Sequence, residues 1–236
     1  MCPVPSPSSD TAGHILGFFA LPPFPAMRIA RHNKPLVLLQ ASIYRGSLGG
    51  CYTIMDATSR SRLPVGVSGT RLPQWMLPDC TDILLFRPDV LLLVGLPTAM
   101  APTALIPAAS LATIQAQCVV HIVELTYTHD SCYADTLVRK TAQHALLVQT
   151  LIDAGWKVHA PHVILLGTYG TIFSLIQPAL RHLGVTKFAV TPLLRSLHVH
   201  AVTVAWAMVT LRRKLERTNA FRSSPVIPLG LHDYPP

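Results

Sequence analysis

The stretch CVVHIVELTYT, residues 118–128, decides the fold, because almost all of its positions are β-branched, aromatic or otherwise apolar. An apolar run without alternation is typical of a central strand that is buried on both faces. Three polar residues, 129–131, follow and can cap a helix, which the apolar spacing predicts over residues 134–154, ending at Gly155. The centre of the chain is therefore predicted to be a strand followed by a helix.

Elements on either side extend this pattern. The predicted strands cover residues 90–94 and 163–166, and the predicted helices cover residues 172–183 and 192–217. Residues 90–123 carry no charge, but Pro97, Pro102 and Pro107 exclude one continuous helix, so we expect strand, loop and strand there. Strands that alternate with helices predict an α/β core.

Proline content divides the chain into four regions. Residues 1–35 hold seven prolines and are predicted to be a flexible arm. Residues 36–78 are predicted to be a loop-rich N-terminal region. Residues 79–217 carry the periodic pattern and are expected to form the folded core, and residues 218–236 are expected to be a second flexible tail.

Composition narrows the classes of function. The chain has 236 residues, half of them apolar, which is enough to bury a core and excludes a disordered protein. Nineteen Lys and Arg against eleven Asp and Glu give a net charge of +8, which favours an acidic partner such as nucleic acid. Prolines, glycines and histidines interrupt the apolar runs, so no membrane partner is expected. A membrane-associated protein stays open as a third alternative, because it would explain the high mean hydropathy of +0.41. Five cysteines without a C-x-x-C pair argue against a disulfide framework and favour an intracellular compartment.

Two acids differ from the others, because Asp89 and Glu124 lie in apolar strand contexts where an unpaired charge costs several kcal/mol. On neighbouring strands they would lie about 5 Å apart and, at an effective dielectric of about 20, repel by about 3 kcal/mol. A divalent ion reverses this repulsion, and oxygen ligands suit Mg²⁺. The alternative is that each acid pairs with a nearby base, Asp89 with Arg87 and Glu124 with a basic residue of the following helix.

The helix after the strand adds a lysine to this region. Lys140 and His144 share the spacing of three and four with Leu137, Leu147 and Leu151, so they lie on the stripe that faces the sheet. Lys140 would then lie above the end of the Glu124 strand, within reach of a phosphate oxygen. The alternative is that Lys140 extends to solvent while its methylenes pack, and that His144 is a core histidine with satisfied hydrogen bonds. For His144 we favour the second reading.

These residues resemble the PD-(D/E)XK restriction-like nuclease pattern. The likeness rests on Arg87-Pro88-Asp89, on the strand that ends in Glu124-Leu125-Thr126, and on Arg139-Lys140 of the helix. Together with His144 and with residues 162–167, HVILLG, they resemble more specifically the restriction-like endonuclease domain of non-LTR retrotransposons. The resemblance covers about residues 70–217.

The resemblance implies a restriction-endonuclease-like core with a mixed central β-sheet flanked by helices. It implies a target-nicking endonuclease that hydrolyses phosphodiester bonds in DNA with Mg²⁺ or Mn²⁺. The implied catalytic residues are Asp89, Glu124 and Lys140, and the metal would be held by Asp89, Glu124 and the backbone carbonyl of Leu125. The implied DNA contacts are Arg71, Arg87 and Arg139.

The resemblance has one departure and several further implications. The usual pattern has a lysine two residues after the acid, where this chain has Thr126, although the retrotransposon members resemble the chain in carrying the lysine on the helix. A catalytically inactive nucleic-acid-binding remnant of the same fold therefore stays open as an alternative. The resemblance also implies a nuclear or other intracellular location, and a reverse transcriptase encoded by the parent element as a partner.

Overall fold

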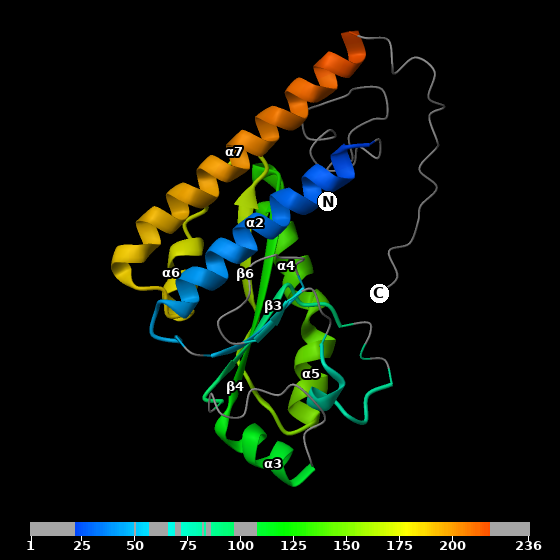
Figure 1. Ribbon diagram of the computed structural model, residues 1–236, viewed down its shortest axis with the longest axis vertical. Helices are drawn as coiled ribbons and strands as arrows, with labels where there is room; N and C mark the ends of the chain where they lie inside the picture. Colours follow the sequence, from blue (N-terminus) through cyan, green and yellow to red (C-terminus); the bar gives the residue numbers. More distant parts are fainter. Residues whose placement is uncertain are drawn as a thin grey trace.

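The computed structural model describes residues 22–49, 51–56, 66–68, 72–81, 83, 86–96 and 108–217. The strands are β1 (Tyr52–Met55), β2 (Gly66–Ser68), β3 (Val90–Val94), β4 (Val119–Thr128), β5 (Lys157–Val158) and β6 (His162–Gly167). The helices are α2 (Phe24–Tyr44), α3 (Ala108–Gln117), α4 (Tyr133–Gln143), α5 (Ala145–Asp153), α6 (Ile176–His182) and α7 (Lys187–Arg217). The chain is a mixed α/β protein with helices flanking a mixed sheet, which confirms that part of the prediction (Figure 1).

Strand β4 is the centre of the six-stranded sheet. The order is β2-β1-β3-β4, and both β5 and β6 pair with the remaining edge of β4. Strand β3 runs antiparallel to β4 with Val90 opposite Val123, whereas β6 runs parallel to β4 with Val163 beside Glu124. The parallel connection from β4 to β6 contains α4 and α5, as such a crossover requires. The prediction of a central strand at residues 118–128 is confirmed.

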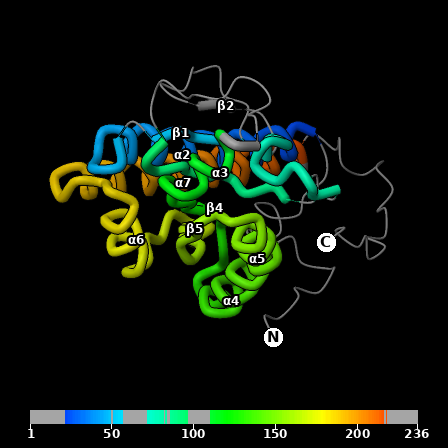
Figure 2. Tube along the Cα trace, turned by 90° about the horizontal axis from the view of Figure 1, so that it is seen from below, coloured from blue at the N-terminus to red at the C-terminus, as the bar shows by residue number. Residues whose placement is uncertain are grey.

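Helices bury both faces of β4, so its apolar residues divide by alternation. Val123 and Leu125 pack in the core cluster formed with α2, α6 and α7, whereas Val120 and Ile122 pack in the cluster that contains residues of α3 and α5. Figure 2 shows α4 and α5 across β4 from α2 and α7. Helices α2 and α7 lie side by side (Figure 1). Phe24 at the start of α2 is fully buried in a cluster with Ala205 and Met208 of α7.

The predicted flexible arm over residues 1–35 is wrong from Phe24 onward, because α2 begins there and continues to Tyr44. Proline is tolerated in a first helical turn, whose N–H groups have no partner within the helix. Leu36, Leu39 and Ile43 then recur at spacings of three and four and are buried against the sheet. The loop-rich prediction is likewise wrong for residues 36–44, while residues 1–21 and the predicted tail at 218–236 lie outside the described residues.

Four other expected elements need correction. The stretch expected to be strand, loop and strand contains the helix α3, which begins at Ala108, directly after the last proline of the run. The single helix predicted over residues 134–154 is two helices, because the chain turns at His144 between α4 and α5. Helix α6 begins only at Ile176, and α7 begins at Lys187, earlier than predicted.

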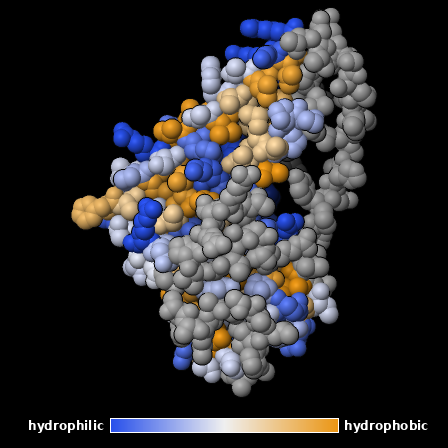
Figure 3. Space-filling model, in the orientation of Figure 1, coloured by the Kyte–Doolittle hydropathy of each residue, from blue (hydrophilic) through white to orange (hydrophobic). Residues whose placement is uncertain are grey.

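Helix α7 is the one described helix that is long and apolar enough to cross a membrane, judged by length and composition alone. Core helices of soluble proteins satisfy the same criterion. Figure 3 shows apolar surface along α7, and its exposed large apolar side chains are Phe188, Val199, Val202 and Trp206.

Among the described cysteines, Cys51, Cys80 and Cys118 are free, whereas Cys132 is disulfide-bonded, so Cys132 does not support the expected reducing compartment.

Candidate functional site

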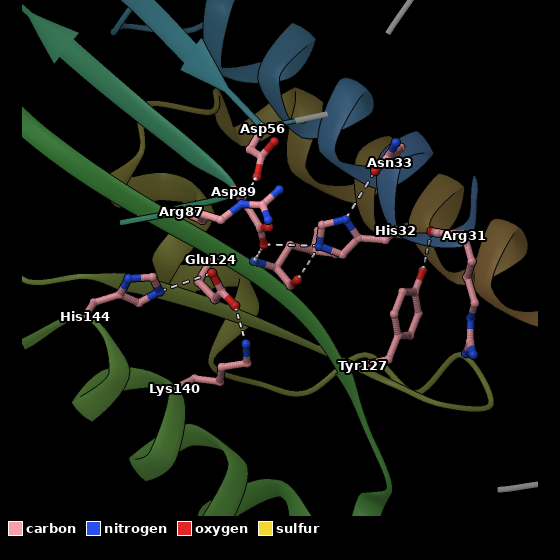
Figure 4. A network of polar contacts seen from close by, with 11 residues as sticks. Arg31, His32, Asn33, Asp56, Arg87, Asp89, Glu124, Tyr127, Lys140 and His144 are labelled. Carbon is pink, nitrogen blue, oxygen red and sulfur yellow. Dashed lines mark hydrogen bonds and ion pairs between the residues drawn. The ribbon is translucent and has the colours of Figure 1, made fainter. Parts of the chain in front are cut away.

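Asp89 and Glu124 come from adjacent strands. Asp89 directly precedes β3, whose first residue, Val90, is paired with Val123, the residue before Glu124. Their side chains are only 15% and 6% exposed, so neither carboxylate is directed into solvent. Figure 4 shows the two acids on either side of a short section of β4, each with its own polar partners.

The Asp89 carboxylate has a backbone donor and a histidine as partners. The backbone N–H of Leu125 donates to Asp89 Oδ2 over 2.7 Å. His32 Nε2, from α2, lies 3.2 Å from the same Oδ2 and 2.9 Å from the carbonyl oxygen of Leu125. A single N–H of His32 therefore points at two oxygens, one from a carboxylate and one from the backbone of β4 (Figure 4).

The negative charge around Asp89 stabilises a positively charged group. Burial opposes protonation of His32, but the hydrogen bond to Asp89 and its negative charge outweigh burial and raise the pKa of His32 to about 9. His32 is therefore cationic at neutral pH. Burial, together with the negative charge of Glu124, raises the pKa of Asp89 in spite of the hydrogen bond from His32. The two acids thus interact, and additional positive charge between them would be stabilising.

The Glu124 carboxylate has a partner for each oxygen, and both come from the following helical segment. Lys140 Nζ donates to Oε1 over 2.5 Å, and His144 Nε2 lies 3.1 Å from Oε2. The side chains of Lys140 and His144 are 16% and 4% exposed. Burial alone would raise the pKa of Glu124, but the hydrogen bond from His144 and the charge of Lys140 outweigh it and lower this pKa. Glu124 is therefore held as a buried anion.

The structure joins Lys140 to Glu124 and places Asp89 near enough to Glu124 for their charges to interact. The catalytic and metal-binding roles of these three residues stay predictions. The alternative pairing of Asp89 with Arg87 is not formed, because Arg87 Nε lies 3.3 Å from Asp56 Oδ2. The alternative pairing of Glu124 with a base of the following helix is formed, with Lys140 as that base. His144 is a buried histidine with a satisfied hydrogen bond, as favoured, although its partner is Glu124 itself.

Sequence reasoning missed His32, because it assigned residues 1–35 to a flexible arm. A signal was present, because His32, Leu36, Leu39 and Ile43 follow one another at successive spacings of four, three and four residues. This spacing places His32 on the buried face of α2. The preceding residue, Arg31, is also buried, and its guanidinium lies 3.9 Å from the ring centroid of Tyr127. The Tyr127 hydroxyl donates to the Arg31 carbonyl oxygen, which ties α2 to β4.

Two of the arginines predicted to contact DNA, Arg87 and Arg139, are among the described residues. Arg87 is exposed beside the site, with 57% of its side chain accessible. Arg139 is exposed on α4, one position before Lys140. Arg71 lies outside the described residues.

The oxygen donors of the site suit magnesium. In the described part of the chain, no three His, Cys, Asp or Glu side chains are arranged to hold one metal ion. The site instead offers two carboxylates and the carbonyl oxygen of Leu125, and Mg²⁺ takes oxygen ligands and commonly only one or two protein carboxylates. The cationic N–H of His32, which contacts Asp89 and Leu125 together, marks a position where positive charge is already stabilised.

Comparisons with known proteins add no family to this picture. No protein-family model matches the chain, and no curated protein sequence matches it. The geometry of the residues around Asp89 and Glu124 therefore carries the functional argument.

Proposed function

We propose that this protein is a metal-dependent DNA endonuclease with a restriction-endonuclease-like core, a target-nicking domain related to those of non-LTR retrotransposons. The observation that carries the proposal is the convergence of Asp89 Oδ2 and the Leu125 carbonyl oxygen on one cationic N–H, beside Glu124 and its lysine. Two acids from adjacent strands, a backbone carbonyl and an amine from the next helix are the groups that the resemblance requires.

Asp89, Glu124 and the carbonyl oxygen of Leu125 would hold Mg²⁺ or Mn²⁺. The bound ion would supply Lewis acidity toward water and toward the scissile phosphate. The His32 N–H contacts two of these three oxygens, so His32 and a metal ion compete for them. Metal binding therefore requires the His32 side chain to move away from Asp89 and Leu125.

Lys140 supplies a positive charge that is positioned by the fold. Its ammonium group is fixed by Glu124, and the 16% exposure of the side chain leaves it reachable from solvent. An ammonium in a mostly buried setting stabilises a phosphate charge more than it would in water. Lys140 is thus suited to orient the nucleophile and to stabilise charge that develops on the phosphate.

DNA would be bound through its phosphates. Arg87 and Arg139 are exposed on the segments that carry Asp89 and Lys140, and the net charge of +8 favours a polyanion. Phosphate contacts of this kind carry no sequence information but position the duplex. DNA affinity is therefore expected to fall steeply with salt.

A second candidate function is a catalytically inactive nucleic-acid-binding remnant of the same fold. Two observations favour it: both oxygens of Glu124 are taken by Lys140 and His144, and His32 contacts the proposed metal oxygens. In this reading the polar network is a structural element that neutralises two buried acids. Thr126, in place of the usual lysine, fits the same reading.

A plasmid-nicking assay with Mg²⁺ or Mn²⁺ separates the two candidates. We expect the wild type to nick supercoiled DNA, and Asp89→Asn, Glu124→Gln and Lys140→Met to lose most of this activity while still binding DNA. Asp56→Asn is the matched control, because Asp56 is an acid of the same region that pairs with Arg87 instead. A wild type that binds DNA in a salt-dependent manner but does not nick it would establish the remnant, and full activity of Lys140→Met would remove Lys140 from the mechanism.

A further inference from the structure

Four histidine rings meet on the face of the sheet opposite Glu124. His121 lies on β4, His162 on β6, His159 between β5 and β6, and His182 at the end of α6. The ring centroids are 4.4 Å apart for His121 and His159, and 5.5 Å apart for His159 and His182. They are 5.2 Å apart for His182 and His162, and 5.6 Å apart for His162 and His121, so the four rings form a closed circuit.

This four-histidine cluster is independent of the Asp89 and Glu124 site. Side chains alternate between the faces of a strand, so His121 shares the face of Val123 and Leu125, which is covered by α2, α6 and α7. Glu124 lies on the opposite face, against Lys140 and His144. The four-histidine cluster therefore lies across β4 from Glu124, Lys140 and His144, whereas His32, which contacts Asp89, comes from α2 on the same side of β4 as His121.

The cluster contains no acid. In the described part of the chain, no hydrogen bond or ion pair joins any of its four rings to a carboxylate. Burial, followed by the neighbouring histidines, lowers the pKa of His121 and of His162 to about 4. Both rings are therefore neutral at neutral pH, and a neutral imidazole has one nitrogen with a lone pair, the form in which histidine binds metals.

The spacing of these rings matches that of histidine ligands on a tetrahedral metal. His121 Nδ1 lies 3.3 Å from His162 Nε2. Zinc–nitrogen bonds of about 2.0–2.1 Å at tetrahedral angles set two ligating nitrogens about 3.3–3.4 Å apart and the ring centroids about 5.2 Å apart. The nitrogen distance agrees with the first value. Three of the centroid distances, 5.2, 5.5 and 5.6 Å, are close to the second value, whereas the stacked rings of His121 and His159 are closer together, at 4.4 Å.

We propose that the four-histidine cluster binds a divalent transition-metal cation of the zinc class, with His121 and His162 as the first two ligands. As the side chains stand, no three His, Cys, Asp or Glu of the described residues converge on one point. His159 and His182 therefore complete the site by turning their rings, and both are exposed, so the turn does not disturb the core. Imidazole nitrogens select Zn²⁺, Cu²⁺ or Ni²⁺ over Mg²⁺, which distinguishes this site from the oxygen-lined one.

A metal in the four-histidine cluster would link three parts of the fold. Its ligands come from β4, from the start of β6 and the segment before it, and from the end of α6. Because these parts come together only in the folded state, the cation would bind the native protein and raise its thermal stability.

Isothermal titration of the full chain with zinc chloride at neutral pH tests the proposal. The test variant is the double substitution His159→Ala and His182→Ala, and His129→Ala is the control, since it removes an exposed histidine outside the cluster. Asp89→Asn serves to separate the two sites. We expect one Zn²⁺ per chain in the wild type, in His129→Ala and in Asp89→Asn, with a rise in Tm on zinc addition.

The double variant should bind Zn²⁺ about tenfold more weakly or worse, because loss of a direct ligand costs at least as much as loss of an outer-shell partner. Its Tm without metal should match that of the wild type, since both side chains are exposed. Absence of saturable zinc binding by the wild type would overturn the proposal, as would undiminished binding by the double variant. Loss of binding in Asp89→Asn would assign the zinc to the other site and would also overturn it.

Discussion

The buried ion pair between Glu124 and Lys140 gives a sharp test of the site that does not depend on its function. Lys140 Nζ and Glu124 Oε1 are 2.5 Å apart, and the two side chains are 16% and 6% exposed. Removing one partner of a buried ion pair leaves an uncompensated charge, and the loss of stability is typically about 3–5 kcal/mol. We therefore expect Glu124→Gln to lower the free energy of unfolding by about 3–4 kcal/mol.

Lys140→Met should cost less, about 2–3 kcal/mol, because His144 still donates to Glu124. The double variant removes both charges together, so its loss should be smaller than the sum of the single losses by about 1–3 kcal/mol. Both replacements nearly preserve side-chain volume, so cavities contribute little to this coupling energy.

Urea denaturation followed by tryptophan fluorescence measures these values, since Trp75 and Trp156 are buried in the core. The exposed pair Arg87 and Asp56 is the matched control, because their side chains are 57% and 26% exposed and their coupling should lie at about 0–1 kcal/mol. If the Glu124 and Lys140 coupling were as small as that of the control pair, the assignment of a desolvated ion pair at the centre of the site would be refuted.

Three further predictions concern other parts of the molecule. The pKa values of His121 and His162 are lowered to about 4 in the folded state, so as pH decreases the unfolded chain binds protons at these histidines before the folded protein does. The free energy of unfolding should therefore fall as pH decreases from about 6.5 toward 4. The expected loss is roughly 2 kcal/mol per histidine after allowance for partial exposure. Denaturation midpoints measured across this range should show a shallower fall in His162→Gln, and an equal fall would contradict the assignment. His32→Ala should lower the Mg²⁺ concentration needed for half-maximal nicking, because it removes the competing cation, and an unchanged requirement would argue against a metal at that position. Gly184→Ala should destabilise the protein by about 2 kcal/mol or more, since its φ is +78° and an added Cβ would lie 2.7 Å from Ser47 Oγ. Gly155→Ala should cost about 1 kcal/mol, because its φ is +90° but the nearest atom to an added Cβ is Gln115 Oε1 at 3.6 Å, an ordinary van der Waals contact. Equal thermal shifts for the two variants would show that the close contact at Gly184 carries no energy.

Local sequence was sufficient to place the acids and the lysine on their elements. The apolar run at residues 118–128 predicted a central strand, and an acid within it was unusual enough to identify Glu124. The spacing of Lys140 and His144 placed both on the sheet-facing side of the helical segment, where they contact Glu124. These predictions succeeded because periodicity fixes which face of an element a side chain occupies.

Counting prolines failed where their position mattered. Seven prolines in residues 1–35 predicted an arm, but the apolar face of α2 gains more from burial against the sheet than the prolines cost, and α2 consequently carries His32 to Asp89. The same error hid α3, which begins directly after the last proline of its run.

The sequence by itself determined the α/β character, the central strand and the buried acids, because each depends on residues within a few positions of one another. Only the tertiary structure decided that His32 rather than Arg87 neutralises Asp89, from 57 positions away, and that four histidines from separate segments meet on one face. The periodicity of apolar residues predicts which face of a helix or strand is buried. Which other helix or strand packs against that face depends on the packing of the whole chain.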